Sequence, residues 1–220
     1  MRRAWLIPAI LTLSTLPCLA RADMIWSDAN KSPMSSWSAY MYDQNVKRHL
    51  RERASRPSGQ AAAPSAQASA APPSSPITAT DFRRDPNGKD VVAQFIAASN
   101  LPPADGSKLG AALRSTMTQL GAAGRKDNIA TAMTLLIGLC YAVLEKPGFD
   151  PGRADDLIPS VNDALAASPQ FRSLGQADRQ NMYDSMLLST AVLAIVHQSG
   201  DKAASQTIAR QSLAQLGLSI

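Results

Sequence analysis

The chain has 220 residues, a formal net charge of +5 at pH 7 and two cysteines, Cys18 and Cys140. Its only concentration of basic residues is a short run near residue 50, whereas a nucleic-acid-binding domain usually carries a concentrated basic face. Two cysteines, of which one lies in an apolar N-terminal segment, exclude a small secreted fold stapled by several disulfides. We therefore expect no nucleic-acid partner and a fold that depends on its hydrophobic core.

Residues 1–22 have the three parts of a secretory signal peptide. Arg2 and Arg3 form the charged start, residues 5–16 form an apolar stretch, and Ala20-Arg21-Ala22 is a small-x-small cleavage signal. The apolar stretch is shorter than the roughly 20 residues that span a bilayer. The segment therefore predicts export rather than a membrane anchor.

Cleavage of this segment would start the mature chain near Asp23. Three arginines leave with it and no acidic residue does, so the net charge falls from +5 to +2. We expect a periplasmic or secreted protein with no transmembrane span. An uncleaved anchor and a lipid anchor at Cys18 are alternatives, and Pro17 opposes the second because a small residue usually precedes a lipid-anchored cysteine.

Residues 23–56 form a polar N-terminal segment with scattered aromatic residues. Residues 36–53 contain no proline or glycine, so they predict a short helix that forms when docked, since an isolated helix of this length is marginal in water. The candidate binding residues are Trp37, Tyr40, Lys47, Arg48 and Arg51. They would contact an unknown protein or envelope partner, or the anionic head groups of a membrane in a peripheral contact. The simpler alternative is a solvated basic helix face.

Residues 57–79 consist almost entirely of alanine, proline, serine and glutamine, without a charge. Such a segment buries too little apolar surface to offset the entropy of ordering it. Its prolines favour extended, semi-rigid conformations. We interpret it as a disordered linker that tethers the N-terminal segment to the following domain.

Residues 80–220 show helical periodicity and no alternating β-branched run, which predicts a single all-α domain, a bundle of five to six helices. The predicted helices cover residues 85–100, 105–120 and 129–144, a segment between 151 and 168, and residues 173–199 and 201–216. The third is apolar nearly all round, so we expect it at the centre of the domain. The fifth carries one polar residue in its apolar stripe, Ser189, whose hydroxyl is expected to bond a carbonyl one turn back.

Several residues have the chemistry of helix starts. Pro86 suits the first turn of the first helix, and either Asp127 or Asn128 suits the cap of the third. Ser173 with Gln176 has the spacing of a capping box for the fifth helix.

The start of the fourth helix is ambiguous. Asp155 and Asp156 suit a first turn because carboxylates favour the positive end of the helix dipole. Pro159 either kinks that helix or stands in its first turn. For the sixth helix, Asp201 after Gly200 predicts a cap.

From Thr80 onward the chain resembles a bacterial exported family catalogued as domain of unknown function 6683. The segments that carry the resemblance are Thr80-Asp81-Phe82-Arg83, GRKDNIATAM at residues 124–133, ADRQNM at residues 177–182 and Leu216-Gly217-Leu218. The family pattern has an acid after the alanine of the third helix and an aromatic residue one turn later, where this chain has Thr131 and Leu135. The resemblance implies a helical fold and export, and it names no reaction.

No catalytic, metal or cofactor constellation stands out in the sequence. His49 and His197 lie far apart and lack a zinc-binding spacing, and Cys140 lies in the most apolar helix, where burial raises a thiol's pKa. We therefore expect no metal, no cofactor and a non-enzymatic binding or interaction module. The alternatives are a hydrolase-type enzyme that uses Cys140 or His197, and a helical carrier of an apolar ligand.

Overall fold

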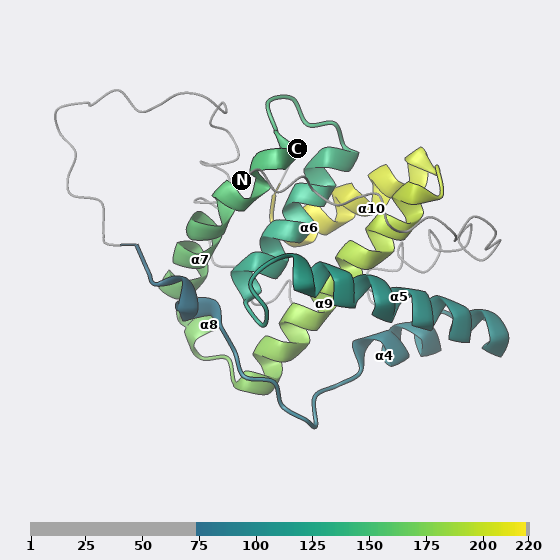
Figure 1. Cartoon of the computed structure of the whole chain (residues 1–220), viewed down its shortest axis with the longest axis horizontal. Helices are drawn as coiled ribbons and strands as arrows, with labels where there is room; N and C mark the ends of the chain where they lie inside the picture. The colour runs from purple at the N-terminus through teal and green to yellow at the C-terminus, as the bar shows by residue number, and fades with distance from the viewer. Residues whose placement is uncertain (1–73, 219–220) are drawn as a thin grey trace.

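The computed structural model of the chain describes residues 74–218. Within this range it contains seven α-helices, two 3₁₀-helices and no strand, which confirms the all-α fold (Figure 1). The elements are η3 (Ile77–Thr80), α4 (Val91–Ala98), α5 (Pro103–Ala123), α6 (Ile129–Val143), η4 (Pro151–Leu157), α7 (Ile158–Ala167), α8 (Pro169–Arg172), α9 (Gln176–Gln198) and α10 (Lys202–Gln215). The predicted signal peptide, residues 23–56 and most of the predicted linker lie outside the described residues.

Helix α6 is the central element of the domain. It packs against α7, α9, α10 and η4, and nearly every one of its residues is buried. A helix that is apolar all round is stable in water only when other elements cover it on every side. The prediction that the third helix is central is therefore confirmed.

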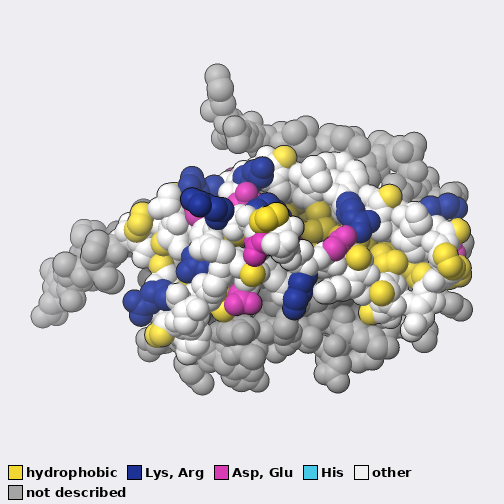
Figure 2. Space-filling model, turned by 90° about the horizontal axis from the view of Figure 1, so that it is seen from below, with side chains coloured by type: hydrophobic (Ala, Val, Ile, Leu, Met, Phe, Trp, Pro, Cys, Tyr) yellow, Lys and Arg dark blue, Asp and Glu magenta, His cyan; other side chains and the backbone are white. Residues whose placement is uncertain are grey.

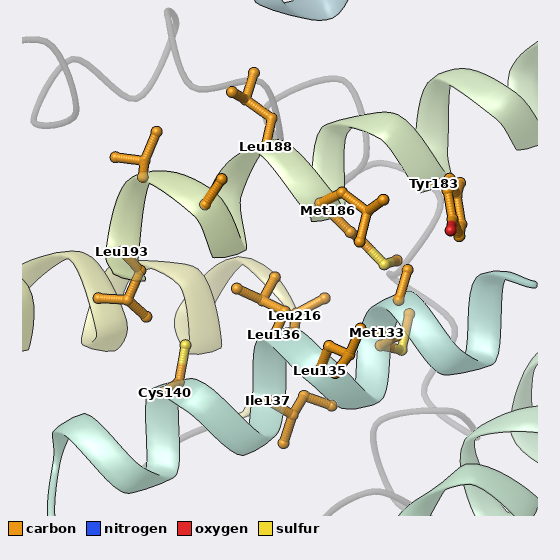
Figure 3. Packing of buried hydrophobic residues seen from close by; sticks show 14 of the residues in the cluster. Met133, Leu135, Leu136, Ile137, Cys140, Tyr183, Met186, Leu188, Leu193 and Leu216 are labelled. Atoms are coloured by element: carbon orange, nitrogen blue, oxygen red, sulfur yellow. The ribbon is translucent and has the colours of Figure 1, made fainter. Parts of the chain in front are cut away.

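The interface between α6 and α9 holds the largest part of the core. Side chains of the two helices point toward one another, among them Met133 and Leu136 from α6 and Met186 from α9 (Figure 3). These three side chains have no solvent exposure, and Leu188 and Leu193 of α9 have none either. These side chains therefore belong to one buried apolar core that joins α6 and α9.

The remaining helices cover this pair. Helix α5 packs on α9 and on the short α4, while α10 contacts both α6 and α9. Gly106 favours the close approach of α4 and α5, because a Cβ there would lie 3.0 Å from the Ile96 Cγ2 atom and the Ile96 side chain would have to shift.

The predicted start of the first helix is wrong. Pro86 lies in a turn closed by a hydrogen bond from the Gly88 N–H to the Asp85 carbonyl at 3.0 Å. Helix α4 begins later, at Val91, where the Asp90 carboxylate accepts from the N–H of Ala93. Proline fits the second position of such a turn as well as it fits a first helical turn.

The capping box predicted at Ser173 is also wrong. The Ser173 hydroxyl donates to the carbonyl of Gln170 at 2.7 Å at the end of α8, a short helix that was not among the predicted elements. The side chain of Ser168 caps the start of α8, and α9 begins after Gly175 with no side-chain cap.

The fourth predicted helix is divided. Residues Pro151–Leu157 form the 3₁₀-helix η4, and α7 begins at Ile158 with Pro159 in its first turn. Asp155 and Asp156 therefore precede α7 instead of occupying its first turn. The second predicted helix is longer than expected, since α5 starts with Pro103 and continues to Ala123.

Three local predictions are confirmed. Asn128, not Asp127, caps α6, with its side chain accepting from the N–H of Thr131. The Asp201 carboxylate caps α10. The Ser189 hydroxyl donates to the carbonyl of Ser185, one turn back, at 2.9 Å.

Replacing Leu136 with alanine tests the role of the α6–α9 interface. Loss of this fully buried side chain should lower the free energy of unfolding by about 2–5 kcal/mol, because both the transfer energy and a cavity contribute. Urea unfolding followed by far-ultraviolet circular dichroism measures the change. Lys108→Ala, at an exposed position of α5, serves as the control and should change little. Equal effects of the two substitutions would contradict the central position of α6.

Candidate functional site

The segment that joins η3 to α4, residues 81–90, is called the strap here. It runs past the first turns of α9 on its way to α4 (Figure 1). Gln176 and Gln180 lie one turn apart on α9, so their side chains point the same way. The Gln176 Oε1 accepts from the N–H of Arg83 at 2.7 Å, and the Gln180 Oε1 accepts from the N–H of Asp85 at 2.6 Å. Two glutamine side chains thus satisfy backbone donors of the extended strap.

The start of the strap is anchored by one aromatic residue and one backbone pairing. The Phe82 N–H donates to the carbonyl of Asp127 at 3.0 Å, within an isolated antiparallel bridge between Asp81 and Asn128. The Phe82 ring lies 5.3 Å from the ring of Tyr183, tilted by 56°. Asp127 has a φ of 53°, a left-handed conformation that aspartate adopts more readily than most residues.

Asn128, which is fully buried, connects the strap to α6 and η3. Its Nδ2 donates to the carbonyl of Ile77, the hydroxyl of Thr80 and the carboxylate of Asp81, at 2.9, 3.0 and 2.7 Å. Its Oδ1 accepts from the N–H and the hydroxyl of Thr131 at 2.9 and 3.0 Å. One amide therefore caps a helix and holds the segment that crosses it.

This network continues into α7. The Thr80 hydroxyl donates to the Oδ1 of Asn162 at 2.9 Å, and the Nδ2 of Asn162 donates to the carbonyls of Ser75 and Pro76, each at 3.1 Å. The N–H of Ser75 donates to the Asp163 carboxylate at 2.6 Å. Residues 75–79, at the end of the predicted linker, are thus bound to the helical domain.

Asp81 carries the charge closest to this network. Arg125 donates to both oxygens of its carboxylate, and the Arg125 Nε lies 2.8 Å from Oδ1. The pKa of Asp81 is lowered, chiefly by this pairing and further by the hydrogen bond from Asn128, while partial burial acts in the opposite direction. Asp81 is therefore ionised at neutral pH with its oxygens already engaged.

A second ion-pair cluster holds the middle of the strap. The Arg84 Nε lies 2.8 Å from the Asp127 carboxylate, and its Nη2 lies 3.1 Å from the Asp184 carboxylate. Burial raises the pKa of Asp184, and the hydrogen bond from Arg84 opposes this effect. The Arg84 guanidinium also lies 5.8 Å from the ring centre of Phe82 and 5.4 Å from that of Tyr183.

An open pocket of about 410 Å³ lies beside the strap and is lined by Asp81, Phe82, Arg83 and Gln176. Arg179 borders this group, since its Nη1 donates to the Asp81 carbonyl at 3.3 Å. Figure 2 views the molecule from below, the side on which the strap lies in Figure 1, and shows Lys and Arg side chains standing among acidic and hydrophobic ones. Within residues 74–218 the exposed Arg83 side chain has no ion-pair partner.

The residues of the catalytic alternative do not form a site. Cys140 has no solvent exposure, and burial raises the pKa of its thiol well above the ordinary range. His197 is exposed in the last turn of α9. Because the thiolate is the nucleophilic form, a buried thiol with a raised pKa does not supply a nucleophile, and no catalytic role is assigned to either residue.

The predicted binding residues, Trp37, Tyr40, Lys47, Arg48 and Arg51, lie outside the described residues. The strap was not predicted as a site. Residues 85–90 were assigned to the first predicted helix, and residues 81–83 were named only for the family resemblance. Their signal was present, however, since the three longer segments that carried the family resemblance meet at the strap through Asp81, Arg125 and Arg179.

Thr131 and Leu135, the two residues noted as differing from the family pattern, each have a clear place in the structure. Thr131 is the third residue of α6 and donates from its hydroxyl to the capping Asn128, so it occupies the position at which an acid completes a capping box. Leu135 is buried in the core.

Within residues 74–218, no three histidine, cysteine, aspartate or glutamate side chains are grouped so that they could hold a metal ion. No helix of the same part of the chain is long and apolar enough to cross a membrane.

The fold and the strap define a class of protein, namely an all-α domain whose N-terminal strap is held across a helical bundle by buried polar side chains. The chain belongs to the family of unknown function DUF6683, whose sequence profile matches residues 1–219. Neither a curated protein nor a solved structure matches it.

Replacing Asn128 with alanine tests the network beneath the strap. The change removes a helix cap and leaves buried partners of Asn128 without a hydrogen bond, so the free energy of unfolding should fall by about 2–4 kcal/mol. Urea unfolding of the full chain measures this. Asn87→Ala, at an exposed position of the strap, should change stability little. A loss no larger than that of the control would contradict the role of Asn128.

The ion pair between Asp81 and Arg125 predicts a pH-dependent stability difference. Because the pKa of Asp81 is lower in the folded chain, its contribution is present above the unfolded value of about 3.9 and is lost as the pH falls through the folded value. Arg125→Gln should therefore lower the Tm at pH 7 by a small amount, and the difference should shrink between about pH 5 and pH 2.

Thermal unfolding of the wild-type protein and of the Arg125→Gln variant, from pH 7 to pH 2, measures this difference in Tm. Arg153→Gln is a matched control, because it breaks a more exposed ion pair with Asp156. An Arg125→Gln effect of equal size at pH 7 and pH 2 would show that the pair does not cause it.

Proposed function

We propose that the protein is an exported binding module, in which a rigid helical domain presents the strap and its pocket to a partner. The observation that carries this proposal is the open pocket beside the strap, whose walls are held in place by the strap's hydrogen bonds to α9. A surface that is already ordered loses little conformational entropy on binding, which favours affinity.

The arrangement of buried polar groups supports the same role. Asn128, Thr80 and Asn162 are almost completely buried and are all hydrogen-bonded. Such groups are costly to bury unless they are paired, and here their pairing fixes the path of the strap. The position of Arg83 relative to Gln176 follows from that path.

In this proposal the N-terminal segment is a second contact. The part of the linker before residue 75 acts as a tether, because residues 75–79 are bound to the helical domain. Trp37, Tyr40, Lys47, Arg48 and Arg51 bind the same partner or the envelope surface near it. Aromatic and arginine side chains contribute most to many binding interfaces. Linking two weak contacts raises the overall affinity through the effective concentration that the tether sets.

The proposed location is the periplasm or the extracellular space, after removal of residues 1–22. The support is the charged start, apolar stretch and small-x-small signal of that segment.

An affinity capture with the full chain tests the proposed function. The chain is tagged at its C-terminus, expressed with its own N-terminus, cross-linked in intact cells and recovered from the envelope fraction. A specific partner should be enriched with the wild-type chain and fall several-fold with Trp37→Ala/Tyr40→Ala and with Lys47→Gln/Arg48→Gln/Arg51→Gln, since anchors of this kind are energetically dominant. The intact mass of the recovered chain shows whether it begins near Asp23.

The control is Lys108→Gln/Arg210→Gln, which removes exposed charges from α5 and α10 and should leave recovery unchanged. Identical recovery with all variants would contradict a binding role of the N-terminal segment. Recovery of no partner above a tag-only control would contradict the binding module itself.

A further inference from the structure

We propose that the pocket beside the strap binds a carboxylate carried by a small apolar group, the chemistry of an N-acylated amino acid or of a peptide's C-terminal residue. This inference rests on the proposed binding function and names its ligand class. The pocket, at about 410 Å³, lies within the usual range of sites for small ligands, about 300–1,000 Å³.

The charges around the pocket favour an anion. Arg125 pairs with the Asp81 carboxylate, Arg179 donates to the Asp81 carbonyl, and Arg83 lines the pocket beside Asp81. The Asp81 carboxylate is already engaged by Arg125 and by the buried Asn128. Arg83 is therefore left without a carboxylate partner in the described part of the chain, and a guanidinium binds a carboxylate through two parallel hydrogen bonds.

Gln176 supplies a second donor next to Arg83. Its Oε1 is used by the backbone N–H of Arg83, which orients the amide and leaves the two hydrogens of its Nε2 for a ligand. The bond also holds the Arg83 backbone against Gln176, so the exposed Arg83 side chain starts beside the Gln176 amide.

Phe82 and Asp81 narrow the ligand class. Phe82 lines the pocket, and its ring is held against Tyr183, which provides an apolar contact for the group that carries the carboxylate. Asp81 also lies on the wall. Its charge repels a doubly charged phosphate more strongly than a singly charged carboxylate.

An NMR titration of the ¹⁵N-labelled full chain tests the proposal with N-acetyl-L-leucine and, as its uncharged match, N-acetyl-L-leucinamide. The acid should cause saturable shifts at the amides of Phe82, Arg83 and Gln176, and the amide should cause none at the same concentrations. Arg83→Gln should weaken binding of the acid at least tenfold, about the effect of a 1.4 kcal/mol loss. The control Arg210→Gln, at an exposed position of α10, should bind the acid as the wild-type chain does.

Four results would overturn the proposal: no saturable shift at these residues, equal binding of the acid and its amide, unchanged binding by Arg83→Gln, or tighter binding of phenyl phosphate than of N-acetyl-L-leucine. The capture experiment separates these outcomes from a failure of the proposed function. If the capture experiment still enriches a partner while the pocket binds no carboxylate, the proposed binding function stands and the partner contacts another surface of the protein.

Discussion

The path of the strap is set by one buried amide, that of Asn128. It begins the central helix by capping α6, and it binds η3 and the start of the strap through the carbonyl of Ile77, the hydroxyl of Thr80 and the carboxylate of Asp81. A buried amide that makes all these bonds adds specificity as well as stability, because any other path of the strap would leave donors and acceptors unpaired in the interior. The residue that caps α6 therefore also determines where the strap lies.

The strap is held by polar contacts more than by burial. Phe82 is its one large apolar anchor, while Gln176 and Gln180 bond its backbone and Arg84 pairs with carboxylates of α9 and of the loop before α6. Hydrogen bonds and ion pairs are directional, and they fix where a segment lies even when their net free energy is modest. This fixed position is what leaves Arg83 and Gln176 side by side at an open pocket.

The sequence predicted the helical domain well because the relevant forces are local and periodic. Apolar residues three and four apart define the faces of α5 and α9, and the unbroken apolar surface of α6 requires a central position. The errors occur where one residue type serves two local structures. Pro86 suits both a turn and a first helical turn, and Ser173 suits both the end of one helix and the start of another; in each case tertiary contacts decide between them. The pocket could not be predicted from composition, because it is built from residues more than 90 positions apart.

Local sequence pattern was sufficient for the fold class, the central position of α6 and the cap at Asp201, since periodicity and capping chemistry act over a few residues. The choice of Asn128 over Asp127 as the cap of α6 came from the structure. The sequence also shows where the three longer family segments lie along the chain, but it does not show that they come together in the fold. Only the tertiary structure brought Asp81 to Arg125 and Arg83 to Gln176, because these pairs form only after α6 and α9 pack together and give the strap a surface to cross. The candidate site is therefore a product of long-range packing, whereas the scaffold that carries it follows from local pattern.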